Sequence, residues 1–209
     1  MSQRVASKER YFDALLPHIS VLTQDIACLV EPAQKAALDP RYLTIYFPNG
    51  IKDFLSDLQH AMDKRMMAAY QAHLSPEQGI FGKIWICLTQ RFLLMAPHKR
   101  LYQQINGLKN HLPYLSLCTQ LLYKTVDKIW YLAGDQATDH NYYTKRFSLY
   151  YVYVRTFSYW LALPDDSNLT LAFDYMKARF QETKKLAQLK GCFDNVRPFA
   201  KDSTHKEGS

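Results

Sequence analysis

Apolar residues recur every three or four positions along most of this chain, which is the spacing that places them on one face of an α-helix. Glycine is scarce, and the prolines stand mostly between the repeats. The pattern therefore predicts an all-α fold with short connections. Long helices are expected at about residues 51–69, 76–95, 113–133, 140–161 and 165–189, and shorter ones at about 8–19, 97–108, after Glu31 and after Asp39–Pro40.

The segment of residues 133–146, AGDQATDHNYYTKR, separates two of the longest repeats. Gly134 follows the first repeat and suits the left-handed conformation that often ends a helix. Thr138 and Asp139 precede the second repeat and offer side-chain oxygens that can cap its first turn. Because so few residues separate these two signals, the helices are expected to fold back on each other as an antiparallel pair.

Aromatic and basic side chains gather in the first turns of the second of these helices, at Tyr142, Tyr143, Lys145 and Arg146. Two interpretations are open for them. They form a surface that binds a partner, or the tyrosines belong partly to the core and the two cations to a solvated face.

The composition excludes several classes of protein. Hydrophobic residues make up 48% of the chain and aromatic residues 14%, which is too many for a disordered chain. The four cysteines are far apart with no CxxC pair, and the histidines form no HxxxH or ExxH pair, so no metal site is indicated. The chain also lacks GxSxG, a glycine-rich phosphate loop and GxGxxG. We therefore expect no metal, no cofactor and no enzymatic activity.

The net charge of +7 is unevenly distributed. Residues 1–75 contain equal numbers of basic and acidic residues, so the whole excess lies in residues 76–209. Because DNA-binding proteins draw much of their affinity from phosphate contacts, a neutral N-terminal part makes nucleic-acid binding an unfavoured hypothesis. The basic part is suited to an acidic partner or an anionic membrane surface.

Residues 147–163, FSLYYVYVRTFSYWLAL, carry a single charge and approach the length of a membrane span. Arg155 at the centre favours the alternative of a helix buried on most sides. If such helices pack loosely, the space between them is an apolar cavity that can take a lipid tail. Its candidate walls are Trp85, Phe92, Leu122 and Tyr153, with ordinary core packing as the alternative for each.

The first residues, MSQRVASKERYF, lack the apolar centre of a secretory signal and the arginine and serine richness of a transit peptide. A cytoplasmic location is the simplest interpretation. A processed protein of the mitochondrial matrix is the alternative.

From about Asp127 to Lys185 the chain resembles the C-terminal domain of the lipid-binding auxiliary protein family of ubiquinone (coenzyme Q) biosynthesis. The resemblance is carried by AGDQATDHNYYTKR, by Tyr159–Trp160 and by DYMKARFQETKKL. The earlier segment LDPRYLTIYFPNGIKDFL is similar more loosely. The family has a fold similar to TetR-type regulators and assists the di-iron hydroxylase that acts on demethoxyubiquinone.

The resemblance implies a TetR-like helical bundle. Residues 1–75 are then a helix-turn-helix-like three-helix part, residues 76–190 a bundle for lipid binding and dimerisation, and residues 191–209 a flexible tail. It implies a non-enzymatic homodimer that binds a polyprenylated quinone intermediate, or a phospholipid, and presents the quinone to the hydroxylase. Peripheral contact with the inner membrane is also implied.

The family's surface for the hydroxylase can be transferred to individual residues of this chain. The family usually has tryptophan where this chain has Tyr142, so the aromatic face is smaller here. The positions are Ile129, Trp130, Asp139, Tyr142, Tyr143, Lys145 and Arg146.

Two other functions stay open. Thr23, Asp25, Ile26 and Ala27 resemble the TxxDIA start of a TetR helix-turn-helix, so a ligand-responsive transcriptional repressor is the alternative. Two observations argue against a repressor. The 22 positions from Asp25 to Phe47 are more than a compact DNA-binding helix-turn-helix needs, and no glycine marks the turn between its helices. The third interpretation is an interaction protein whose interior is filled by its own side chains.

Overall fold

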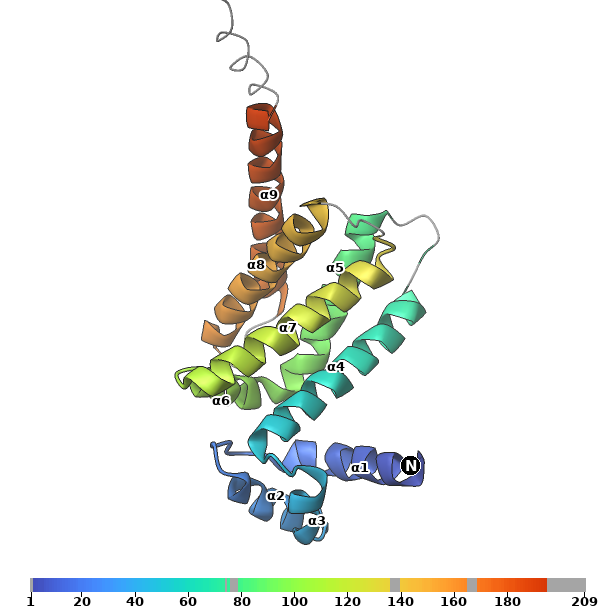
Figure 1. Cartoon of the computed structure of the whole chain (residues 1–209), viewed down its shortest axis with the longest axis vertical. Helices are drawn as coiled ribbons and strands as arrows, with labels where there is room; N and C mark the ends of the chain where they lie inside the picture. Colours follow the sequence, from blue (N-terminus) through green and yellow to red (C-terminus); the bar gives the residue numbers. More distant parts are fainter. Residues whose placement is uncertain (1, 74, 76–78, 136–139, 165–168, 195–209) are drawn as a thin grey trace, which may run out of the picture.

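The structure is a computed structural model that describes residues 2–73, 75, 79–135, 140–164 and 169–194, with the side chains of most of them. The regular structure within these ranges is helical (Figure 1), which confirms the predicted all-α class. The TetR-like arrangement implied by the resemblance stays a prediction, as does the division of the chain at residue 75.

The helices fall close to the predicted repeats. The first helix begins before Lys8 and the last continues past Leu189. The prediction did not include these extensions because they lack the apolar repeat on which it relied. The predicted tail of residues 191–209 therefore starts within a helix, and residues 195–209 lie outside the described part. The α-helices are α1 Ser2–Leu15, α2 Val30–Lys35, α3 Arg41–Tyr46, α4 Ile51–His73, α5 Ile80–Met95, α6 Lys99–Leu108, α7 Leu112–Leu132, α8 His140–Ala162 and α9 Leu169–Asp194.

The turn between α2 and α3 forms without a glycine. Ala37 adopts a left-handed φ of 54°, and the Leu38 amide donates to the Ala33 carbonyl at 2.8 Å, which closes the end of α2. In the turn that leads into α3, the Asp39 carboxylate accepts from the Arg41 amide at 2.9 Å. The missing glycine therefore does not prevent a compact turn here.

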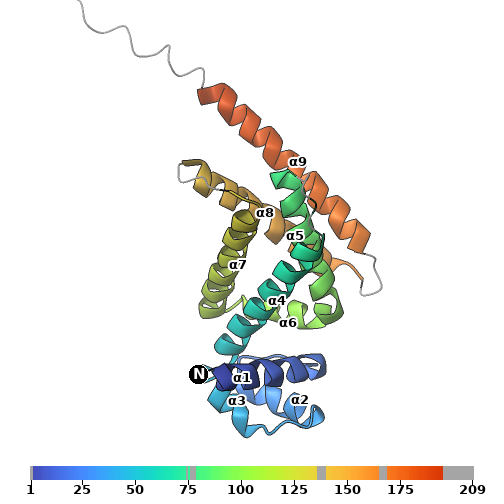
Figure 2. The ribbon, with the colours of Figure 1, turned by 90° about the vertical axis from the view of Figure 1, so that its right-hand side faces the viewer.

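Helix α4 connects the N-terminal part to the rest of the molecule. It starts beside α1 and α3 and then runs along α5 and α7 (Figures 1 and 2). Phe54, Leu58, Met62 and Met66 are buried along it, at the spacing of one helix face. These residues belong to one hydrophobic core that contains side chains from both α1 and α8.

Helix α8 contains the long apolar segment that raised the possibility of a membrane span. It packs mainly against α9 and α7, and Val152, Thr156 and Trp160 are buried along it, while Arg155 is exposed. Among the residues described here, no helix has both the length and the apolar character needed to cross a bilayer. The helix is therefore buried on the side that faces its neighbours, while Phe147, Tyr151 and Arg155 are exposed along it.

Candidate functional site

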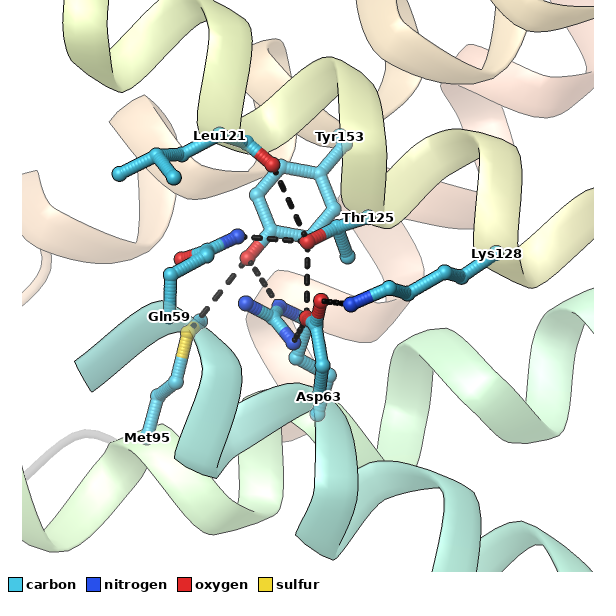
Figure 3. Close-up of polar contacts among 8 residues, drawn as sticks. Gln59, Asp63, Met95, Leu121, Thr125, Lys128 and Tyr153 are labelled. Atoms are coloured by element: carbon cyan, nitrogen blue, oxygen red, sulfur yellow. Dashed lines mark hydrogen bonds and ion pairs between the residues drawn. The ribbon is translucent and has the colours of Figure 1, made fainter. Parts of the chain in front are cut away.

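A buried ion pair joins α4 to α5 in the middle of the bundle. The Arg91 guanidinium is 0% exposed and donates from Nη1 to Asp63 Oδ1 at 2.7 Å (Figure 3). Burial opposes the charged form of Arg91, but Tyr153 and Asp63 nearby hold the pKa of its guanidinium above the usual value. The Arg91 guanidinium is therefore charged, and its bond to Asp63 fixes it in position.

Side chains from α7 and α8 complete this network around Asp63. Thr125 donates to Asp63 Oδ1 at 2.8 Å, and Lys128 pairs with Oδ2 at 2.7 Å. On the other side, Arg91 Nε donates to Tyr153 Oη at 2.9 Å. Figure 3 shows these groups converging from α4, α5, α7 and α8, so the network links four helices through one carboxylate and one guanidinium.

Next to the network lies a cavity of about 70 Å³ that is partly open to solvent. Its wall is mostly apolar and is formed by α4, α5, α6, α7 and α8. The lining residues are Leu55, Leu58, Gln59, Met95, Tyr102, Ile105, Lys109, Cys118, Leu121, Leu122, Tyr153, Val154 and Phe157. Two of these, Gln59 and Tyr153, also belong to the polar network, so the cavity has a polar side in an otherwise apolar wall.

Lys109 is the one charged side chain among the described residues that line this cavity. It is partly exposed, its Nζ lies 5.1 Å from the centre of the Phe157 ring, and it donates to Asn106 Oδ1 at 3.2 Å. Burial lowers the pKa of Lys109 from its usual value. Among the described residues, the cavity therefore has one ionisable amine in a wall that is otherwise uncharged.

The corner between α7 and α8 is held by a second ion network. Gly134 has φ of 88°, as expected for the residue that ends α7. The nearly buried Asp135 carboxylate accepts from Lys145 Nζ at 2.7 Å and from Arg146 Nη1 at 3.2 Å. Arg146 Nε also donates to Asp127 Oδ1 at 2.6 Å. These contacts tie the start of α8 to the end of α7.

Two aromatic side chains pack inside the same corner. The Arg146 guanidinium lies 3.3 Å from the centre of the Tyr142 ring, and the Tyr142 hydroxyl bonds to Asp127 at 3.1 Å. Trp130 donates from its indole nitrogen to the Lys145 carbonyl at 3.2 Å. Asp135, Tyr142, Lys145 and Arg146 thus have a structural role in joining the helices.

Residues 115–187 match the family model of COQ9. This part of the chain is similar to that family, and we call residues 115–187 the COQ9 region. The match contains the span from Asp127 to Lys185 that carries the resemblance, and the family has a role in ubiquinone biosynthesis. Among curated proteins, none matches the chain significantly.

The COQ9 region contains most of α7, all of α8 and most of α9, so it includes the α7–α8 corner and one side of the cavity. The other side of the cavity comes from α4, α5 and α6, which precede the match. The cavity is therefore built by packing the COQ9 region against helices outside it.

The residues predicted as lipid-binding walls are not all gathered at the cavity. Leu122 and Tyr153, both in the COQ9 region, line it. Phe92 is instead fully buried behind Tyr153, with 5.6 Å between ring centres, and Trp85 packs at 6.5 Å against Phe173 of α9. Phe92 and Trp85 do not line this cavity, because α5 turns them toward α8 and α9, and their role in lipid binding stays a prediction.

The predicted partner-binding residues of the COQ9 region also separate into two groups. Ile129 is 0% exposed and Arg146 is 4% exposed, so neither presents its side chain to solvent, and their role in partner binding stays a prediction. Core packing buries Ile129, and two carboxylates hold Arg146 inside the corner. Trp130, Tyr142 and Lys145 are half-buried, Tyr143 is exposed, and Asp139 lies outside the described residues.

Two exposed aromatic side chains at this corner were missed from the sequence. Tyr131 in the last turn of α7 is 79% exposed, and Phe147 in α8 is 69% exposed, one turn after Tyr143 at 68%. The spacing of four residues between Tyr143 and Phe147 was the available signal, since it places both on one helix face. We call Tyr131, Tyr143 and Phe147 the corner aromatics.

The cavity residues Gln59, Tyr102 and Lys109 were missed as well. Tyr102, Ile105 and Lys109 recur at the spacing of one helix face, but nothing in that pattern tells which helices it meets. In the parts of the chain that the structure describes, no group of histidine, cysteine and carboxylate side chains could hold a metal ion.

Proposed function

We propose that this protein is a non-enzymatic lipid-binding auxiliary protein of ubiquinone biosynthesis. It binds a polyprenylated quinone intermediate and presents it to a di-iron demethoxyubiquinone hydroxylase. The observation that carries this proposal is the largely apolar cavity that the COQ9 region forms with α4, α5 and α6, next to a buried polar network. An apolar wall with a few fixed polar groups is the usual form of a site for an amphiphilic ligand.

Transfer of an isoprenoid chain from water into such a wall gains about 25 cal/mol for each Å² of apolar surface that is buried. The cavity volume of about 70 Å³ is smaller than the roughly 150 Å³ of an engineered cavity that binds benzene. Ligand entry therefore requires the lining side chains to move apart. Met95 and the lining leucines can allow this movement, because flexible aliphatic side chains, methionine above all, adapt to new neighbours.

Mass spectrometry of lipids extracted from the purified protein tests the proposal. The native protein is expected to carry an isoprenoid lipid, and Leu122→Trp is expected to lose most of it, because the larger ring fills the cavity. The matched control is Leu93→Trp, since Leu93 is an exposed leucine on α5 that does not line the cavity. Native protein without any isoprenoid lipid, or equal lipid content in both variants, would contradict the proposal.

The corner aromatics support the second part of the proposal, contact with the hydroxylase. Large exposed aromatic side chains are enriched at protein interfaces, where they supply much of the binding energy. They sit on a corner that buried ion pairs hold rigid, so little ordering is needed on binding. The proposal also includes a homodimer through α8 and α9 and peripheral contact of the tail with the inner membrane.

Tyr143→Ala is expected to weaken hydroxylase binding by about 1–2 kcal/mol, because it removes an exposed aromatic contact from the corner. Quinone hydroxylation in a reconstituted assay should fall with it, while lipid content stays unchanged. Tyr42→Ala is the control, since Tyr42 is an exposed tyrosine on α3, outside the COQ9 region. Equal hydroxylation rates for Tyr143→Ala and native protein would contradict the assignment of this surface.

A further inference from the structure

The wall of the cavity contains a buried hydroxyl group that bonds to nothing in the described protein. Tyr102 on α6 lines the cavity and is 5% exposed. Its Oη is buried and has no hydrogen-bond partner among the described residues. A buried polar group without a partner costs free energy, so its persistence calls for a reason.

The surrounding polar groups are already committed to other bonds. Tyr153 Oη accepts from Arg91 and donates to the Met95 sulfur at 3.5 Å. Gln59 Nε2 donates to Thr125 Oγ1 at 2.6 Å. The Tyr102 ring is fixed by Phe157 and Trp160, at 6.0 and 6.2 Å between ring centres. Tyr102 thus presents an unused hydroxyl on a rigid ring beside a network that is already paired.

This hydroxyl is a hydrogen-bond donor at any physiological pH. Burial raises the pKa of Tyr102 well above its ordinary value, with a smaller opposing influence from Arg91. The proton therefore stays on Oη. A ligand that pairs with this hydroxyl must place an acceptor oxygen in the apolar cavity and must be uncharged there, since burial of an unpaired charge costs free energy.

We propose that Tyr102 is the polar anchor of the cavity and donates a hydrogen bond to a ring carbonyl oxygen of a neutral quinone lipid. This inference rests on the proposed lipid-binding function and names the chemical group that the site recognises. It distinguishes a quinone from an isoprenoid chain without oxygen, which the apolar wall alone cannot do.

The test compares two probes on the purified full chain by titration with fluorescence detection. One probe is a benzoquinone with a two-isoprene tail, and the other is the same tail as a plain hydrocarbon. Tyr102→Phe removes only the hydroxyl, so its Kd for the quinone is expected to rise about tenfold, as loss of one hydrogen bond predicts. Its Kd for the hydrocarbon should not change.

A stability measurement separates this role from a structural one. Because the hydroxyl has no partner among the residues that the structure describes, Tyr102→Phe is expected to raise the urea midpoint of ligand-free protein. Tyr153→Phe is the matched control on the same wall. Its hydroxyl holds Arg91, so the midpoint is expected to fall.

Each outcome decides a different point. Unchanged quinone affinity of Tyr102→Phe, or a lowered urea midpoint, would overturn the anchor. Equal affinity of native protein for the two probes would overturn the anchor alone. Binding of neither probe by native protein would overturn the lipid-binding function and the anchor with it.

Discussion

Asp63→Leu is expected to lower the free energy of unfolding by about 3–5 kcal/mol, because removal of one partner of a buried ion pair leaves the other charge without compensation. Among the described residues, Arg91 would keep only the neutral Tyr153 hydroxyl as a partner, and Lys128 would lose its carboxylate. Urea unfolding followed by circular dichroism measures the change.

Two controls test this reason. Glu9→Gln removes an exposed carboxylate from its pair with Lys64 and should cost no more than about 1 kcal/mol. The double variant Asp63→Leu/Arg91→Met should recover part of the loss, since it removes both buried charges together. A double variant as unstable as the sum of its two single changes would show that the unpaired charge is not the cause.

Asp135→Asn is expected to lower the free energy of unfolding by about 2–4 kcal/mol, because hydrogen bonds to buried charged groups contribute most of their strength through the charge. The substitution keeps the shape of the side chain but removes the negative charge that Lys145 and Arg146 share. Urea unfolding of the purified protein gives the value.

The control is Asp127→Asn, which acts on the same guanidinium. The Asp127 side chain is 46% exposed, so water can replace its contact with Arg146 Nε, and the cost should stay near 1 kcal/mol. If Asp127→Asn cost as much as Asp135→Asn, burial would not be what makes the Asp135 contacts strong.

Together these two networks fix the parts of the molecule on which the proposed function depends. The Asp63–Arg91 pair sets the spacing of α4, α5, α7 and α8 around the cavity, while Asp135 and Arg146 set the angle at which α8 leaves α7. A rigid frame of this kind lets the lining side chains move without loss of the bundle. It also keeps the corner aromatics in a constant position for a partner.

The 133–146 segment shows how far the amino-acid sequence specifies the site. Gly134 was correctly expected to end α7, and the sequence alone displays the clustering of charged and aromatic residues at the corner. The sequence does not show which of these residues face solvent. A partner-binding surface and partly buried core residues have the same sequence pattern and differ only in burial. Arg146 is buried because it pairs with Asp127 near the end of α7 and with Asp135 just after it. The sequence alone does not show which residues a side chain will contact.

The cavity could not be predicted from the sequence either, because its lining depends on contacts between distant residues. Its wall takes residues from five helices spread between Leu55 and Phe157, and most of them also fit an ordinary core position. Phe92 and Trp85 satisfied the same apolar pattern as Leu122, yet α5 turns both away from the cavity. Nothing in the sequence indicates that Tyr102 matters, because whether its hydroxyl finds a hydrogen-bond partner depends on which residues surround it.

The sequence by itself determined the all-α class, the approximate bounds of the helices and the COQ9 resemblance, because these depend on local periodicity, capping residues and a contiguous motif. Only the tertiary structure decided which charges are buried, where the cavity lies and which aromatic side chains stay exposed. These properties arise from contacts between residues far apart in the chain, such as Asp63 with Arg91 and Lys128, and local sequence does not specify such contacts.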